Sequence, residues 1–362
     1  MIKKQDLWSH LATTDKKIVM YGMGNGADKI LSVCAERGIE VADFFASDGF
    51  VRGHMFHGKR VLSYSEAKEK YGADGMIVLL SFASSLPCVL ENIYRIADEC
   101  ELYAPDVPVC GTDIFDSDFY EKNAEKIATV RQILADDESV AVFDSVVGFK
   151  LTGDVKLLCE GHSDFSEVLT KIAQAQNFKT VADLGAYNGD TLRELAPVAP
   201  ALERAIAFEP DKRNFKKLSD YAAGEQGFEI ETHNLAAWKG SETLFFDGGG
   251  NRNSTLLGGN AIAVGKAQKV VEVRADSLDS VVGARHVDYI KYDVEGAEKE
   301  ALSGSQSTIS RCMPTLCVSL YHRSGDIFEL PLMIKEKFPQ YKLYMRRREY
   351  IPAWDTVLIA KT

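Results

Sequence analysis

The sequence has no long hydrophobic run, no closely paired cysteines and no excess of basic residues. Its longest apolar stretch, 76–90, is interrupted by serines and a proline and is too short to span a bilayer. The seven cysteines are scattered without a CxxC pair, which argues against a zinc knuckle and favours reduced, buried thiols.

The formal net charge of −11 argues against a general nucleic-acid-binding protein, because such a protein needs a basic surface. Residues 1–17 lack the apolar core of a signal peptide. We therefore expect a cytoplasmic protein with no membrane span and no nucleic-acid partner. With 46% hydrophobic and 26% charged residues over 362 positions, the composition is that of an ordinary globular protein of two or three domains.

In the first third of the chain, short apolar runs at 17–21, 39–45, 76–81 and 102–109 predict the strands of a small α/β domain. The sequence GMGNGA at 22–27 follows the first run, fits GxGxxA and leads into a predicted helix at 28–37.

Asp48 follows the second run roughly 26 residues after Gly22, near the spacing expected for a ribose-binding acid. Two interpretations stay open. Either Gly22, Gly24 and Asp48 form a nucleotide or nucleotide-sugar site, or the glycine turn only packs a helix on a strand.

The chain is organised around KTVADLGAYNGDT at 179–191. A buried strand ends in Asp183, a turn with Gly185 and Gly189 follows, and a helical pattern begins at Asp190. A strand that leads through a glycine turn into a helix N-terminus forms the ligand crevice of a doubly wound sheet. Glycines are suited to this turn because a Cβ would keep the backbone away from the ligand.

Four more strands are predicted at the spacing of successive strand–helix units. The run at 205–208 ends in Glu209, a carboxylate that can accept hydrogen bonds from both hydroxyls of a ribose. The runs at 228–233 and 287–290 lead into HNLAAW and KYDVEGAE, and the run at 315–320 leads into Tyr321-His322.

In this order and spacing, DLGAYNGDT, FEP, HNLAAW and KYDVEGAE resemble the FkbM-type S-adenosylmethionine-dependent methyltransferases. SLYH and a closing DTVLIA strand add to the resemblance, which covers the chain from near Thr180 to Ile359. It implies a class I methyltransferase sheet whose last strand is antiparallel. It also implies methyl transfer, usually to oxygen, often on sugars, glycans or secondary metabolites.

The resemblance further implies a site for S-adenosyl-L-methionine, with S-adenosyl-L-homocysteine as product. The turn after the first strand would surround the amino-acid part, Glu209 would hold the ribose, and 234–236 would line the adenine. For each glycine the alternative is a role in packing a helix on a strand. The expected cofactor-binding residues are Asp183, Gly185, Ala186, Asn188, Gly189, Glu209, Asn234, Leu235, Ala236 and Asp293.

Methyl transfer from a sulfonium requires a positioned nucleophile and removal of its proton. His322 is the expected general base because an ordinary histidine pKa of about 6.5 suits this step; the alternative is a histidine bonded to a backbone carbonyl. Asp293 is the second expected catalytic residue, either assisting the hydroxyl or orienting the cofactor's ammonium group. Asp293 and Glu295 could together hold Mg²⁺, but no third ligand is evident, so a metal site is not favoured.

Residues 111–176 predict a helical connector. Ser117-Asp118 and Ser163-Asp164 can each cap a helix with one apolar face, the first running to Leu134. Three glycines at 248–250 predict a loop that either closes over substrate or simply joins two strands.

Together these patterns predict an α/β protein with two Rossmann-like domains, at 1–110 and 177–362, joined by the helical connector at 111–176. The expected function is O-methylation of a small-molecule or glycan-type hydroxyl substrate. Two alternatives stay open: a non-catalytic nucleotide-binding or scaffold protein, and an NAD-dependent oxidoreductase acting through the N-terminal glycine turn.

Overall fold

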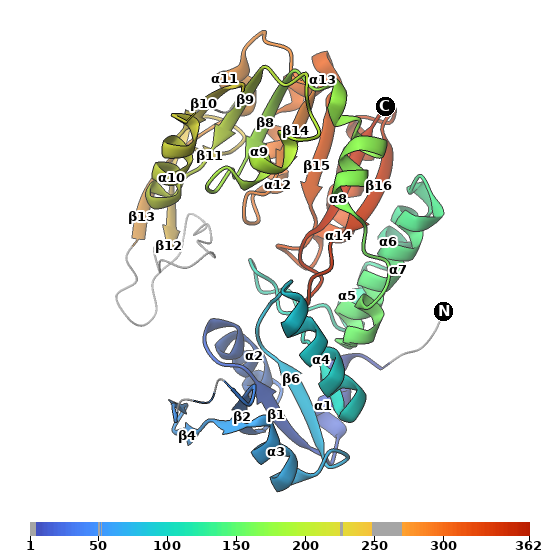
Figure 1. Cartoon of the computed structure of the whole chain (residues 1–362). Helices are drawn as coiled ribbons and strands as arrows, with labels where there is room; N and C mark the ends of the chain where they lie inside the picture. Colours follow the sequence, from blue (N-terminus) through green and yellow to red (C-terminus); the bar gives the residue numbers. More distant parts are fainter. Residues whose placement is uncertain (1–4, 50, 52, 225–226, 248–269) are drawn as a thin grey trace.

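The computed structural model describes residues 5–49, 51, 53–224, 227–247 and 270–362. Figure 1 shows two halves that each contain a sheet, the N-terminal half in blue and the C-terminal half in yellow-green to red. Helices from the middle of the chain, in green, lie beside them. The glycines at 248–250 lie outside the described residues, so both interpretations of that loop remain predictions.

The N-terminal sheet is parallel throughout and has the strand order β5-β2-β1-β6-β7. β1 and β6 lie at its centre and are buried on both faces, by α1 and α2 on one side and α3 and α4 on the other. This explains why both strands have continuous apolar sequences rather than alternating ones. The elements are α1 Leu7–Thr13, β1 Lys17–Tyr21, α2 Asn25–Glu36, β2 Val41–Ala46, the hairpin β3 Met55–Phe56 and β4 Lys59–Arg60, β5 Leu62–Ser63, α3 Tyr64–Tyr71, β6 Met76–Leu80, α4 Pro87–Glu99 and β7 Glu101–Tyr103.

The middle of the chain is helical, as predicted, but differs in detail. Asp116, rather than Ser117-Asp118, caps the first helix, and Leu134 lies beyond the end of the second. The long helix α7, which the sequence analysis did not predict, packs against β16. Asp164 caps α8 as expected. The elements are α5 Ser117–Lys122, α6 Ala124–Ile133, α7 Asp137–Thr152, η1 Val155–Leu158, α8 Phe165–Glu167, η2 Val168–Ala173 and η3 Ala175–Asn177.

The C-terminal sheet is mixed and has the strand order β10-β9-β8-β14-β15-β17-β16. β17 is antiparallel to both of its neighbours, which confirms the expected antiparallel last strand. A smaller sheet, β11-β13-β12, lies beside it. The elements are β8 Thr180–Leu184, α9 Asp190–Leu195, β9 Arg204–Phe208, α10 Lys212–Ala222, β10 Glu229–His233, β11 Ala236–Ala237, β12 Glu242–Asp247, β13 Val270–Asp276, α11 Leu278–Val282, β14 Tyr289–Tyr292, α12 Glu298–Ser303, α13 Gln306–Cys312, β15 Thr315–Ser319, α14 Asp326–Lys337, β16 Lys342–Arg347 and β17 Thr356–Lys361.

The two halves share one hydrophobic core, which runs from the N-terminal sheet through the middle helices to the C-terminal sheet. Ser84, just beyond the carboxyl end of β6, pairs with Ile351 in the loop between β16 and β17. That loop lies at the carboxyl ends of the parallel strands, since the amide of Leu320 after β15 bonds the carbonyl of Thr356. The carboxyl edges of the two sheets therefore face each other.

Across the described ranges, no helix is both long and apolar enough to cross a membrane.

Candidate functional site

The site residues predicted in the C-terminal half gather at the carboxyl edge of its sheet. The amide of Asp293, after β14, donates to the carbonyl of Leu184 at the end of β8 (2.9 Å). The amides of Gly185 and Ala186 both donate to the carbonyl of Phe208 at the end of β9 (3.0 and 2.8 Å). Backbone bonds thus hold the loops after three neighbouring strands together.

Two glycines in the turn after β8 are required by close packing. Gly185 has φ +92°, and a Cβ there would lie 1.9 Å from the carbonyl oxygen of Asp293. Gly189 has φ +86°, and a Cβ there would lie 2.5 Å from the ring of Tyr221 in α10. A side chain at either position would meet the protein itself, so packing alone accounts for both glycines.

The other two predicted residues of this turn, Ala186 and Asn188, contact neighbouring groups of the protein itself. Ala186 is fully buried in the core beneath the turn. The backbone and side-chain oxygens of Asn188 both accept hydrogen bonds from Nη1 of Arg193 (2.8 and 3.2 Å).

Asp183 is a buried carboxylate without a hydrogen-bond partner among the described residues. It is 1% exposed, and neither of its carboxylate oxygens accepts a hydrogen bond. It lies next to Lys291 across the β8–β14 pairing. Burial raises the pKa of Asp183 to about 7, opposed by the charge of Lys291. A buried, unsatisfied acid is costly and marks a position where a ligand donor would be stabilising.

Glu209 connects the end of β9 to the turn after β8. One carboxylate oxygen accepts the amide of Tyr187 and the other accepts the amide of Asp211, each at 2.8 Å. The side chain is buried, and burial raises the pKa of Glu209 to about 8, opposed by these two amides. Tyr187 has φ +47°, an uncommon conformation for a non-glycine residue that is often found at functional sites.

The three residues predicted to line the adenine have separate environments. The side-chain amide of Asn234 donates to the carbonyls of Glu209 (2.9 Å) and Pro210 (3.1 Å), so it braces the corner after β9. Leu235 packs against the large shared core. Ala236 packs into the core of the smaller sheet.

A histidine surrounded by carboxylates forms the centre of the edge. His322 is 1% exposed, and its Nδ1 lies 2.9 Å from Glu298 Oε1. Its Nε2 lies 3.5 Å from both Asp293 Oδ1 and Glu295 Oε2. Glu298 Oε1 also accepts the amide of Val294 (3.0 Å), so Glu298 secures the loop after β14. The sequence analysis assigned no role to Glu298, which is the first residue of α12 and contacts His322 only in the folded structure.

These contacts change the proton affinities of the cluster. Burial opposes a charge on the ring, but Glu298, Asp293 and Glu295 outweigh it and raise the pKa of His322 to about 10. The expectation of an ordinary histidine pKa at this position is therefore wrong, and the ring is protonated at neutral pH. Burial also acts on Asp293, but Lys291 and His322 lower its pKa overall. Burial, opposed by His322, raises the pKa of Glu295 to about 7.

Asp293 and Glu295 differ in how they are held. Asp293 accepts hydrogen bonds from Lys291 Nζ (3.1 Å) and from the hydroxyl of Tyr321 (3.0 Å). The Glu295 side chain is 42% exposed, and the residue has φ +53°. Glu295 is thus the accessible acid of the pair, and Asp293 the fully bonded one. In the part of the chain that the structure describes, no group of three or more His, Cys, Asp or Glu residues could hold a metal ion.

Two aromatic residues that the sequence analysis missed adjoin this cluster. The rings of Tyr321 and Trp354 are stacked with centroids 6.4 Å apart, and those of Trp354 and Tyr350 with centroids 6.0 Å apart. Trp354 and Tyr350 come from the loop before β17, where the aromatic-rich sequence REYIPAW was the available signal. The three rings extend from Asp293 along the carboxyl edge.

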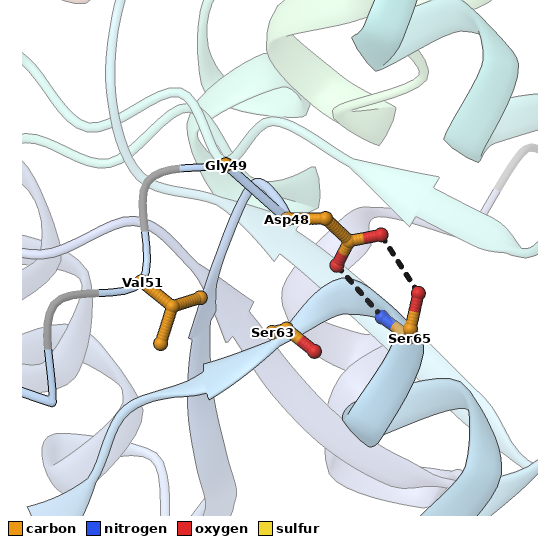
Figure 2. Close-up of a pocket in the computed structure, with 5 residues that line it drawn as sticks. All are labelled: Asp48, Gly49, Val51, Ser63 and Ser65. Atoms are coloured by element: carbon orange, nitrogen blue, oxygen red, sulfur yellow. Dashed lines mark hydrogen bonds between the residues drawn. The ribbon is translucent and has the colours of Figure 1, made fainter.

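The predicted N-terminal residues do not share one pocket. Figure 2 shows Asp48 accepting hydrogen bonds from the amide (3.0 Å) and hydroxyl (2.7 Å) of Ser65 at the start of α3. Asp48 lines a surface hollow of about 450 Å³ whose described lining residues include neither Gly22 nor Gly24. A Cβ on Gly22 would lie 2.6 Å from the ring of Phe82, whereas one on Gly24 would meet nothing within 4 Å.

Comparison with known proteins finds a matching domain in the sequence and a matching fold. The sequence profile of the methyltransferase FkbM domain matches residues 183–352. The crystal structure of methyltransferase FkbM from Methylobacillus flagellatus KT shares the fold over 95% of this chain and 90% of its own, with 22% identity and a TM-score of 0.71.

Other solved structures match about half of the chain. An rRNA methylase from Streptococcus thermophilus has 13% identity and a TM-score of 0.34 over 55% of this chain and 93% of its own. A precorrin-6y C5,15-methyltransferase from Geobacter metallireducens GS-15 has 11% identity and a TM-score of 0.33 over 54% of this chain and 85% of its own. Comparison with curated protein sequences finds no match.

Proposed function

We propose that the protein is an S-adenosyl-L-methionine-dependent O-methyltransferase, because residues 183–352 match the methyltransferase FkbM domain. Its acceptor is a hydroxyl on a sugar, nucleotide sugar, glycan precursor or secondary metabolite. The observation that carries the proposal is the family match on a sheet of order β10-β9-β8-β14-β15-β17-β16. This order brings the matched motifs to one edge, where doubly wound sheets bind their ligands.

The residues at this edge fit the cofactor. Among the described residues, each side-chain oxygen of Glu209 accepts one backbone amide, which leaves capacity for a hydrogen bond with a ribose hydroxyl. The carboxyl group of Asp183, which has no hydrogen-bond partner among the described residues, offers a buried acceptor beside the turn from Gly185 to Gly189. S-adenosyl-L-methionine supplies an electrophilic methyl group on a positively charged sulfur, and an acidic edge complements that charge.

Proton removal falls to Glu295 rather than to His322. His322 is already protonated at neutral pH, because its pKa is raised to about 10, and so cannot accept the proton of a hydroxyl. Glu295 is the more exposed acid of the cluster, so an acceptor can reach it, and a pKa raised towards neutral favours general-base catalysis. The His322 imidazolium then orients Asp293 and Glu295, which both lie 3.5 Å from its Nε2.

The aromatic rings beside the cluster support a ring-shaped acceptor. Tyr321, Trp354 and Tyr350 provide flat apolar surface next to a carboxylate. Such surfaces suit a molecule with an apolar face and polar edges, as a sugar ring has.

Calorimetric titration with S-adenosyl-L-methionine and S-adenosyl-L-homocysteine tests the proposal. We expect micromolar binding to the wild type, weakened by about 1–3 kcal/mol in Glu209→Ala because a buried hydrogen-bonding partner of the ribose is lost. Asp48→Ala, the corresponding acid of the N-terminal sheet, serves as the matched control and should bind normally. If the wild type binds neither compound, the proposal is wrong.

A further inference from the structure

A short segment of the N-terminal half contacts the loops that carry the acidic residues. This crossing segment, 108–113, follows β7 and precedes α5. The amide of Cys110 donates to the carbonyl of His322 (2.9 Å), and its thiol donates to the carbonyl of Glu295 (3.0 Å). The hydroxyl of Ser324 donates to the carbonyl of Asp113. The crossing segment thus bonds the loop after β14 and the loop after β15 together.

The fit around Cys110 is close. A Cβ on Gly296 would lie 2.9 Å from Cys110 Cβ and 3.0 Å from its Sγ, so only glycine lets the loop pass. Glu295 and Gly296 have consecutive positive φ angles of +53° and +92°. This conformation is unfavourable for a glutamate and persists only where the surroundings enforce it. Cys110 bonds the carbonyl of Glu295, and Arg323 Nε bonds that of Gly296 (2.9 Å).

The crossing segment is also anchored to the N-terminal half. The Lys29 ammonium of α2 donates to the carbonyls of Val109 (2.9 Å) and Pro108 (3.3 Å). α2 itself packs against the N-terminal sheet. A continuous path of contacts therefore leads from α2 through Cys110 to the backbone of Glu295.

We infer that the crossing segment positions Glu295 for catalysis, with Cys110 as its central positioning residue. The inference rests on the proposed function, in which Glu295 removes the proton. The N-terminal half is then a structural part of the methyl-transfer site, whatever ligand its own sheet binds.

Hydrogen exchange of the full-length protein, read by mass spectrometry, tests the inference. In Cys110→Ala, the amides of 294–297 should exchange about 3- to 10-fold faster, the range expected for loss of one buried hydrogen bond. Cys110→Ser keeps a donor and should restore the wild-type rate. Cys34→Ala removes another buried thiol, located in α2, and should leave these amides unchanged.

Lys29→Met tests the anchor without changing Cys110, in case the alanine variant fails to fold. It should speed exchange at 294–297 and increase alkylation of Cys110, which is 3% exposed in the folded chain. Unchanged exchange in both Cys110→Ala and Lys29→Met would overturn the inference. Calorimetry with S-adenosyl-L-methionine on the same samples keeps the two proposals apart. Failure to bind contradicts the proposed function, whereas the exchange rates decide the role of the segment.

Discussion

Both sheets begin with a strand that leads through glycines into a helix, and both place an acid after the second strand. In the C-terminal half, that acid, Glu209, is buried and accepts the amide of Tyr187 from the glycine turn itself. In the N-terminal half, Asp48 is exposed and bonds Ser65 at the start of α3 instead. Acid and turn form one unit in the first case and separate units in the second.

Similar spacing between a glycine turn and an acid in the sequence does not imply that the two are in contact in the structure. Asp48 and Glu209 lie at comparable distances along the chain from their glycine turns, yet only Glu209 faces its turn. The C-terminal edge also has an unpartnered acid, Asp183, and a charged histidine, His322. In the described N-terminal residues, the buried side chains at the corresponding strand ends are mostly apolar.

The largest effect should come from the buried histidine–carboxylate pair, with an exposed pair as its comparison. His322→Gln leaves Glu298 buried without a cation and should lower the free energy of unfolding by about 3–5 kcal/mol. His57→Gln breaks the exposed pair with Asp28 and should change the free energy of unfolding by less than about 0.5 kcal/mol. Urea denaturation measures both.

The pH dependence sharpens this comparison. The folded-state pKa of His322, about 10, lies above the ordinary value of about 6.5, so its stabilisation is complete below about pH 6.5. It is lost as the pH rises through about 10. The difference in the free energy of unfolding between the wild type and His322→Gln should therefore shrink over that range. A difference in unfolding free energy that does not depend on pH would contradict a charged His322.

The next effect concerns the glycine turns. Gly185→Ala forces a Cβ against the backbone of Asp293 at φ +92° and should cost about 2–5 kcal/mol of stability, with loss of cofactor binding. Gly24 has φ +94° and ψ −158° with open space around it, so Gly24→Ala should cost only the backbone strain of about 1–3 kcal/mol. Equal costs for the two variants would show that close packing does not distinguish the turns.

The smallest effect is expected at Asp48. Asp48→Ala removes a side-chain acceptor from the first turn of α3 and should cost about 1 kcal/mol. Asp48 has a lowered pKa, owing to hydrogen bonds from Ser65 that outweigh burial, so its stabilisation is present above about pH 4 and falls on further acidification. Thermal unfolding at neutral pH checks the magnitude. A nucleotide that binds the wild type but not Asp48→Ala would support the predicted nucleotide site in the N-terminal half.

Much of the fold followed from local patterns in the sequence. The continuous apolar runs at 17–21 and 76–81 predicted buried strands, because both faces of a parallel sheet are covered, and β1 and β6 lie there. The helix α7 was missed: it buries Val142 and Phe143, but its sequence shows little separation of polar and apolar faces. The cap at Asp116 lies one residue before the predicted one, which is within the ordinary uncertainty of helix ends.

The sequence by itself determined the α/β class, the order of the motifs and the edge at which they meet. Strand periodicity and glycine turns depend on a few neighbouring residues, so they can be recognised from the sequence alone. Only the tertiary structure decided the charge on His322 and the exposure of Glu295. It also decided the hydrogen bond from the Cys110 thiol to the carbonyl of Glu295. Each depends on burial and on groups from separate loops, and proton affinity and backbone strain respond to those surroundings rather than to residue type.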